Sequence, residues 1–281
     1  MEFASAKRSA RTDSDGFRLY FDEALSSRTG YHSDNDYFNK AKDRMDRTFK
    51  LIEPKVPNSD ILDIGASPFY LLYKARTLGA KSCHGVYFAH DSHPLKGIPR
   101  IWSTGGPIEL HHVNIEEENL PFPDNSFDII TACEVLEHLE RFPFRFAREV
   151  HRLLRPNGLL CVTVPNVCSI GNIVKLIFQR NIYYKYRSDP TGRHRHEYTL
   201  GQMKALFSFM GLDVRWAGFL PSPTSHLSAL RPAYRAIAMT PGLRHYSPVL
   251  CVVGRQPDPK RSPDFSEPPS VLYTEDRSIE E

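Results

Sequence analysis

A carboxylate, a glycine and two small residues follow an apolar run in the stretch ILDIGASPFYLL. They are Asp63, Gly65, Ala66 and Ser67. Glycine permits close approach of a ligand to the backbone, and Ala66 and Ser67 take little room. Asp63 could attract the positive charge of a cofactor, or it could anchor the turn, as aspartate often does. The stretch therefore predicts a buried strand that runs into a cofactor-binding turn.

Pro68 removes one backbone donor from this turn. Proline is tolerated in the first turn of a helix, where its missing N–H would have no partner anyway. A pyrophosphate, however, is bound by N–H groups at a helix N-terminus. The turn also lacks the G-x-G-x-x-G spacing of a nicotinamide-dependent dehydrogenase. These residues favour a cofactor without phosphate over a dinucleotide.

Glu134 and His138 are four residues apart in the segment EVLEHL, after a run that reads as a strand. On a helical turn they would share one face. They could orient each other and cap the turn, or His138 could line a site or act as a base. A metal site would need further ligands at suitable spacing. We therefore predict no metal site here.

The segment TGRHRHEYTL holds the densest set of titratable side chains in the second half of the chain. His196 could accept a proton from an acceptor hydroxyl if it lay within hydrogen-bond reach. Alternatively, the neighbouring His and Glu residues brace the start of a helix. Thr199 is a suitable N-cap, and Gln202 three residues later completes a capping-box pattern.

Basic charge is concentrated between residues 166 and 255, which contain 12 lysines and arginines but only three acidic residues. The whole chain has a net charge of +3. Several tyrosines and a phenylalanine are interspersed with these charges. Such a region could attract phosphates, a carboxylated sugar, nucleic acid or an anionic membrane surface. It could also be an ordinary solvated face.

Strand-like and helical patterns alternate between the two ends of the chain. Seven apolar runs read as strands: ILDIG, SCHGVYF, IELHHV, FDIITAC, GLLCVTVP, residues 212–219 and residues 248–253. Apolar spacing predicts helices over 34–53, 70–78, 144–154, 200–210 and about 227–239. Near-continuous apolar strands between helices are typical of a parallel sheet covered on both faces. Ligands of such sheets bind outside the carboxyl ends of the strands.

The composition agrees with a globular protein of one large or two small domains, since hydrophobic residues make up 41% and charged residues 25% of the 281. The polar and proline-rich ends predict disorder over 1–16 and 256–281, with one domain over 17–255 and a cap and insert within about 166–247. Five cysteines without a CxxC pair favour reduced thiols. With no signal peptide and no long apolar span, the expected location is cytoplasmic.

Four segments, in this order, resemble the class I S-adenosylmethionine-dependent methyltransferases (type 11-like). They are ILDIGA, NLPFPDNSFD, EVLEHL and LLRPNGLL. The likeness covers about residues 61–165 and extends more loosely through RHEYT. It implies a doubly wound α/β fold with a mostly parallel seven-stranded Rossmann-like sheet, its last strand antiparallel, to which we add a basic helical cap. It also implies that S-adenosylmethionine lies over the ends of the first four strands.

The resemblance assigns roles to individual residues. It places these residues at the cofactor: Asp63, Gly65, Ala66, Ser67, Tyr87, Asn114 and Glu134. Tyr87 stands where the family usually has an acid that binds both ribose hydroxyls, and its phenol can form one such hydrogen bond. Asn114 could bind the adenine or merely cap its turn. His138 and His196 are the candidate catalytic residues.

The function we expect is O- or N-methylation of a small molecule, a glycan or a lipid-linked sugar, on an acceptor that can be anionic. Family members with a similar HEYTL segment are associated with polysaccharide or lipid-linked sugar pathways. The alternative is a degenerate fold that binds a partner without catalysis. RNA methylation is less favoured, because there is no N/D-P-P-Y/F motif and no appended RNA-binding module. Peripheral membrane contact stays open, and no oligomeric state is predicted.

Overall fold

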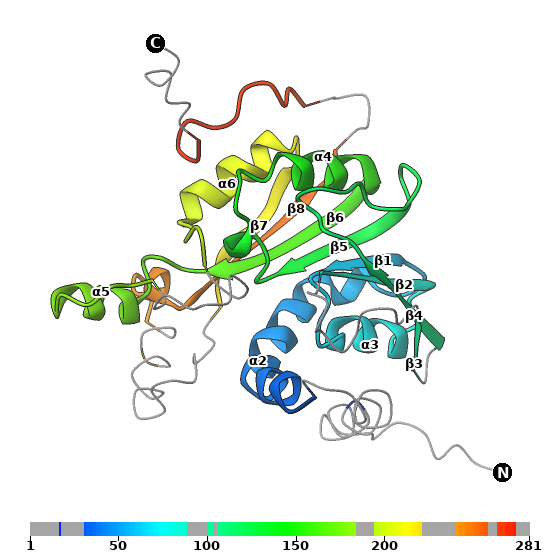
Figure 1. Ribbon diagram of the computed structural model, residues 1–281, viewed down its shortest axis with the longest axis horizontal. Helices are drawn as coiled ribbons and strands as arrows, with labels where there is room; N and C mark the ends of the chain where they lie inside the picture. The colour runs from blue at the N-terminus through cyan, green and yellow to red at the C-terminus, as the bar shows by residue number, and fades with distance from the viewer. Residues whose placement is uncertain are drawn as a thin grey trace.

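An eight-stranded sheet forms the centre of the protein in the computed structural model, which describes residues 17, 31–88, 100–103, 106–183, 194–220, 236, 240–257 and 263–273 (Figure 1). The strand order is β3-β4-β2-β1-β5-β6-β8-β7. The strands are β1 (Asp60–Ile64), β2 (Ser82–Tyr87), β3 (Arg100–Ser103), β4 (Gly106–His112), β5 (Phe127–Cys133), β6 (Leu154–Pro165), β7 (Asp213–Leu220) and β8 (Val249–Arg255).

The seven predicted strands are all present, and the doubly wound, mostly parallel fold is confirmed. Strands β4, β2, β1, β5 and β6 run parallel to one another. The last strand, β8, is antiparallel to both of its neighbours, β6 and β7. β3 was not predicted and adds an eighth strand, antiparallel to β4 at the edge of the sheet. With four residues it is too short to show a periodic pattern.

Helices cover both faces of this sheet (Figure 1). The helices are α2 (Tyr31–Ile52), α3 (Tyr70–Thr77), α4 (Phe144–Leu153), α5 (Ile170–Ile177) and α6 (Leu200–Phe209), with short 3₁₀ turns η1 (Glu53–Lys55), η2 (Leu136–His138) and η4 (Arg244–Tyr246). Phe49 of α2 packs in one core cluster with Ile61 of β1. Leu206 of α6 packs in the other with Leu62 of the same strand. Successive residues of β1 thus face opposite cores, which is why this strand is apolar throughout.

Helix α6 begins where the sequence predicted. The side chain of Thr199 accepts a hydrogen bond from the N–H of Gln202, and the Gln202 side chain accepts one from the N–H of Thr199. This capping box satisfies two N–H groups that would otherwise have no partner at the helix start. It also fixes the direction in which residues 194–198 enter the helix, and these residues contribute to the site described below.

Part of the segment predicted to be disordered from residue 256 contacts the domain. The ring of Phe265 lies 5.3 Å from that of Phe209, and the side chain of Gln202 donates a hydrogen bond to the carbonyl of Val271. Residues 1–16 and most of the predicted helix over 227–239 lie outside the described residues. Among the residues that the structure describes, no helix is both long and apolar enough to cross a membrane.

Candidate active site

Asp63 lies one residue before the end of β1, with its side chain turned into the core. Its Oδ1 accepts a hydrogen bond of 2.6 Å from the hydroxyl of Thr131 on the adjacent strand β5. Burial raises the pKa of the Asp63 carboxyl to about 7, although the Thr131 hydrogen bond works in the opposite direction. A carboxyl group in this state is poised to gain from a nearby positive charge, because such a charge favours its ionised form.

The turn after β1 leaves few backbone N–H groups available to bind a phosphate. The N–H groups of Gly65 and Ala66 both donate to the carbonyl of Val86, one residue before the end of β2, at 2.9 and 3.0 Å. Gly65 has a φ of 73°, and a Cβ on it would lie 2.4 Å from Cγ2 of Val135. Helix α3 begins only at Tyr70, so Pro68 lies before the helix and not, as we expected, in its first turn.

Tyr87 and Asn114 follow on the next two strands. Tyr87 ends β2 and is buried, with its ring 5.4 Å from that of His112. The side chain of Asn114 accepts a hydrogen bond of 3.1 Å from the N–H of Glu116, and the Asn114 N–H donates to the side chain of Glu118. The Asn114 carbonyl is therefore already engaged within its own turn. Contacts of these two residues with a cofactor stay predictions.

Glu134 pairs with a residue that the sequence analysis did not single out. Its Oε2 accepts a hydrogen bond of 3.0 Å from Arg44 of α2, and Oε1 accepts one from the hydroxyl of Thr163. The side chains of Arg44 and Glu134 are only 11% and 14% exposed. One signal was available: Arg44 lies on the apolar stripe of α2, three residues after Ala41, and a charge on that stripe must be buried against a partner.

The two candidate catalytic histidines, His138 and His196, belong to neighbouring segments at the carboxyl edge of the parallel strands. The backbone carbonyl of Glu137 accepts hydrogen bonds from the N–H groups of Arg195 and His196, at 2.6 and 3.3 Å. The ring of His138 lies 5.1 Å from that of His194. Residues 136–138 and 194–196 thus form one wall of the site. The expected pairing of His138 with Glu134 is not among the hydrogen bonds of Glu134, which go to Arg44 and Thr163.

Glu137, His194 and Glu197 complete this wall. Oε1 of Glu197 lies at a hydrogen-bond distance of 2.8 Å from Nδ1 of His194. Glu137 is fully buried, and burial, together with the negative charges of Glu134 and Glu197, raises its pKa well above its usual range. We call Glu137, His138, His194 and Glu197 the Glu137 cluster. His196 lies beside it with its ring 4.6 Å from that of Tyr198, and burial lowers its pKa.

Comparison with known proteins agrees with this architecture. A family model described as a methyltransferase domain matches residues 62–162. A probable S-adenosylmethionine-dependent methyltransferase of Mycobacterium tuberculosis is 29% identical over 118 residues, which are 42% of this chain and 40% of the relative. A ubiquinone/menaquinone biosynthesis C-methyltransferase of Azotobacter vinelandii is 28% identical over 161 residues, 52% of this chain and 63% of that protein. The chain thus spans less than two thirds of either relative.

Solved structures share the fold at low sequence identity. An S-adenosylmethionine-dependent methyltransferase from Mesorhizobium loti superposes with a TM-score of 0.52 at 17% identity, over 74% of this chain and 96% of that one. A possible histamine N-methyltransferase from Thermotoga maritima gives 0.52 at 14% identity, over 81% and 96%.

The sheet order and the glycine turn at its carboxyl edge define a class I methyltransferase fold. Residues 62–162 match the model of the methyltransferase domain family. The predicted resemblance is therefore confirmed, and S-adenosylmethionine is the cofactor that the matching relatives' descriptions name.

The residues at this edge fit that cofactor. The amino-acid part of S-adenosylmethionine carries an ammonium, a carboxylate and the sulfonium. Asp63 and Glu134, at the ends of adjacent strands, are carboxylates that match its positive groups. Within the described part of the chain, Nε of Arg44 is buried without a hydrogen-bond partner, so it can donate to the cofactor's carboxylate. The turn after β1, whose N–H groups at Gly65 and Ala66 already donate to Val86, agrees with a cofactor that has no pyrophosphate.

Proposed function

We propose that this protein transfers the methyl group of S-adenosylmethionine to a hydroxyl or amine of a small molecule, a glycan or a lipid-linked sugar. The observation that supports this most is the pairing of two features at one edge of the sheet. Charges of both signs lie there, the buried Asp63 and the largely buried Arg44 and Glu134, and they would match the charged groups of the cofactor's amino-acid part. The Glu137 cluster and His196 lie beside them, where an acceptor would need a proton acceptor.

The cofactor supplies an electrophilic methyl group on a positively charged sulfur. The protein then has three tasks, which are to align the acceptor with that group, to exclude water and to accept the acceptor's proton. Because burial lowers the pKa of His196, its imidazole is neutral near neutral pH and can accept a proton. His138, on the facing segment, is the second candidate. Neither role requires a dedicated catalytic motif, since transfer to a nucleophile depends mainly on alignment.

Calorimetric titration with S-adenosylmethionine and S-adenosylhomocysteine tests this proposal. We expect both to bind, and we expect Gly65→Ala to weaken both by about tenfold or more. The new methyl group would lie 2.4 Å from Val135 Cγ2, and overpacking of this kind costs roughly 1–3 kcal/mol. Moving Val135 or the turn displaces the backbone that the cofactor contacts.

Gly79→Ala is the matched control for this substitution. Gly79 has a similarly positive φ of 84°, but nothing lies within 4 Å of a Cβ placed on it. The Gly79→Ala variant therefore reproduces the backbone strain without the steric clash. Its affinity for the cofactor should stay close to that of the unmodified protein. If the unmodified protein binds neither ligand at millimolar concentration, the result would instead support a degenerate fold that binds a partner without catalysis. Two observations motivate this alternative: Tyr87 is buried, and the backbone N–H groups of Gly65 and Ala66 already donate hydrogen bonds within the protein.

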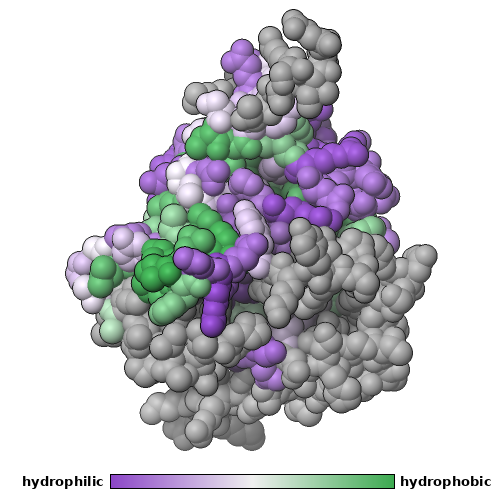
Figure 2. All heavy atoms as spheres, turned by 60° about the vertical axis from the view of Figure 1, so that its left-hand side comes forward, coloured by the Kyte–Doolittle hydropathy of each residue, from purple (hydrophilic) through white to green (hydrophobic). Residues whose placement is uncertain are grey.

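The acceptor class is suggested by helix α5. Ile177 and Phe178, at its end, are 70% and 71% exposed, and Leu176 is also exposed. Figure 2, which brings the α5 side of the molecule toward the viewer, shows apolar side chains gathered there. The surrounding segment is strongly basic. Apolar side chains beside basic ones favour contact with an anionic lipid surface, so we propose that the acceptor is lipid-linked or anionic and is presented at a membrane on the cytoplasmic side.

Vesicle binding checks this role of α5. We expect the protein to sediment with vesicles that contain phosphatidylglycerol and not with neutral ones. The double substitution Ile177→Ser/Phe178→Ser should weaken this binding by about tenfold or more, because each buried apolar side chain is worth roughly 1.5–3 kcal/mol. Val271→Ser, also at an exposed apolar position but far along the chain, should leave it unchanged. Equal binding of the double variant, or a salt-sensitive gel shift with RNA instead, would contradict this assignment.

A further inference from the structure

Glu137 is a carboxyl group whose surroundings do not match a purely structural role. Its side chain is 0% exposed, and in the described structure neither carboxylate oxygen has a hydrogen-bond partner. Among the residues described, Nε2 of His138 lies 3.8 Å from Oε1, which is too far for a hydrogen bond. Burying a carboxylate is costly unless it is paired, hydrogen-bonded or bound to a metal. Such a group points to a ligand that completes the site.

Two imidazoles are placed to share that ligand. Glu137, His138 and His194 each offer one ligand atom, and these atoms all lie within 4.8 Å of one another. Zinc ligands at about 2.0–2.2 Å in tetrahedral geometry lie roughly 3.3–3.6 Å apart. Closing the group around a cation would thus need side-chain movements of only about 1 Å. One carboxylate and two imidazoles form the same donor set as the catalytic zinc sites that keep a fourth position open.

Glu197 supplies the support that such a site requires. It contacts Nδ1 of His194 at 2.8 Å, so it fixes the orientation of the ring. Metal-binding histidines almost always have a carboxylate or carbonyl at their second nitrogen, which sets the tautomer. The other oxygen of Glu197 is buried and has no hydrogen-bond partner among the residues described. The Glu137 cluster therefore contains three buried carboxylate oxygens that receive no hydrogen bond from the part of the chain that the structure describes.

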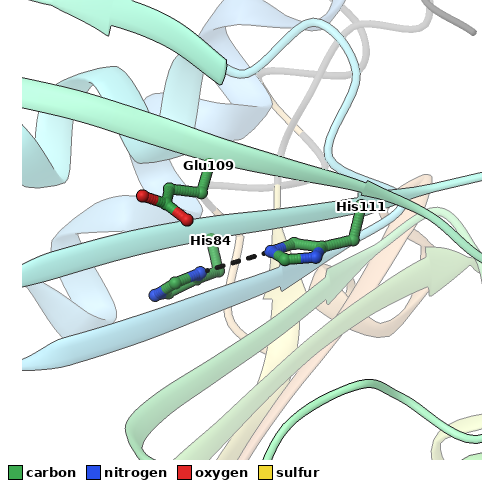
Figure 3. Close-up of side chains that lie close together, drawn as sticks. All are labelled: His84, Glu109 and His111. Atoms are coloured by element: carbon green, nitrogen blue, oxygen red, sulfur yellow. Dashed lines mark hydrogen bonds between the residues drawn. The ribbon is translucent and has the colours of Figure 1, made fainter. Parts of the chain in front are cut away.

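A second cluster provides a useful contrast. Figure 3 shows His84 and His111 with Glu109 on the neighbouring strands β2 and β4. Here Nδ1 of His84 and Nε2 of His111 form a hydrogen bond of 3.4 Å with each other. None of the three side chains has a buried polar atom left without a hydrogen bond. This β2–β4 cluster therefore shows no buried polar atom that calls for a cation, and it serves as the internal control.

We propose that Glu137, His138 and His194 bind a divalent cation, with Zn²⁺ as the preferred ion, and that Glu197 orients His194. The remaining position on the ion would be open to an oxygen of the acceptor. A metal-bound hydroxyl has a lowered pKa, so the site would favour an acceptor with a hydroxyl group. This last step rests on the proposed methyltransferase function, whereas binding of the ion does not.

Zinc titration of the chelator-treated full chain, without S-adenosylmethionine, tests the site. We expect one equivalent of Zn²⁺ to bind with an enthalpy change and to raise the midpoint of thermal unfolding. Glu197→Gln should weaken binding by about 10- to 100-fold, the effect expected for a supporting residue. Glu137→Gln and His194→Ala should weaken it at least as much. The double variant His84→Ala/His111→Ala should bind like the unmodified protein.

Two results would overturn the proposal. One is the absence of zinc binding by the unmodified protein. The other is that the His194→Ala variant still binds one equivalent of Zn²⁺ while the His84→Ala/His111→Ala variant no longer does, which would place the ion in the β2–β4 cluster. Substitution of Co²⁺ for Zn²⁺ gives a second readout, because its visible spectrum reports tetrahedral coordination in folded variants. S-adenosylmethionine titration in the presence of EDTA separates the two proposals. Cofactor binding without zinc binding removes only the metal site, whereas zinc binding without cofactor binding removes only the proposed function.

Discussion

Replacing Asp63 with asparagine should make the protein more stable at about pH 8 while weakening its binding of the cofactor. The folded pKa of Asp63 is about 7, compared with about 4 for an aspartate in an unfolded chain. Because the folded value is the higher one, stability is greatest below the unfolded pKa. It is lost as the pH rises toward 7, and above that the folded protein carries the full penalty of a buried charge.

The size of this effect is roughly 4 kcal/mol, since one pKa unit corresponds to about 1.4 kcal/mol. Asparagine removes the charge and can still accept the Thr131 hydrogen bond. Urea unfolding should therefore show Asp63→Asn gaining stability over the unmodified protein at about pH 8 but not at about pH 4. Asp213→Asn, at a half-exposed position on β7, should differ from the unmodified protein by about 0.5 kcal/mol or less at either pH. A loss of stability for Asp63→Asn at about pH 8 would mean that a cation already pairs with this carboxylate.

Cofactor affinity should change in the opposite direction. A hydrogen bond to a charged group is worth roughly 1.5–3 kcal/mol, so Asp63→Asn should bind S-adenosylmethionine about tenfold or more weakly. In the unmodified protein, affinity should increase between about pH 6 and pH 8, because the cofactor's positive charge favours the ionised form of Asp63. A residue with only a structural role would not combine a gain in stability with a loss of affinity.

Much of the sheet could be predicted from the sequence because strands such as β1, β5 and β8 are buried on both faces. A run such as FDIITAC has apolar or small residues at nearly every position, and β5 occupies those residues, Phe127–Cys133. The start of α6 was equally predictable, because a capping box is a local pattern. β3 was not, since its position depends on pairing with β4 rather than on any pattern of its own.

The site was predicted less completely than the fold. The segment EVLEHL was read as a helical turn with Glu134 and His138 on one face. In the structure Glu134 has a positive φ of 58°, and only residues 136–138 form a short 3₁₀ turn. This geometry directs Glu137 inward instead. His194, which lies near it in the same cluster, comes from a segment more than 50 residues later, and proximity at that range leaves no trace in local spacing.

Arg44→Met should be among the most destabilising single substitutions in the protein. The side chain of Arg44 is only 11% exposed and donates a hydrogen bond of 3.0 Å to Glu134. Its removal leaves a buried carboxylate with only the Thr163 hydroxyl, and breaking a buried ion pair from one side costs roughly 3–5 kcal/mol. Arg47→Met is the matched control. Arg47 lies on the same helix and pairs with Asp43, but its side chain is 45% exposed. The loss of such a surface pair costs about 0–1 kcal/mol.

The double substitution Arg44→Met/Glu134→Gln distinguishes a lost pair from lost packing. If the cost of Arg44→Met comes from the charge left on Glu134, neutralising that charge should restore much of the stability, with a coupling of roughly 0.5–3 kcal/mol in a double-mutant cycle. If the cost comes from the lost methylene and guanidinium contacts, the double variant should be no more stable than the single one. Cofactor binding should not recover in either case, because the buried Nε of Arg44 would be absent from both. Recovery of S-adenosylmethionine binding together with stability would show that Arg44 supports the fold without contacting the cofactor.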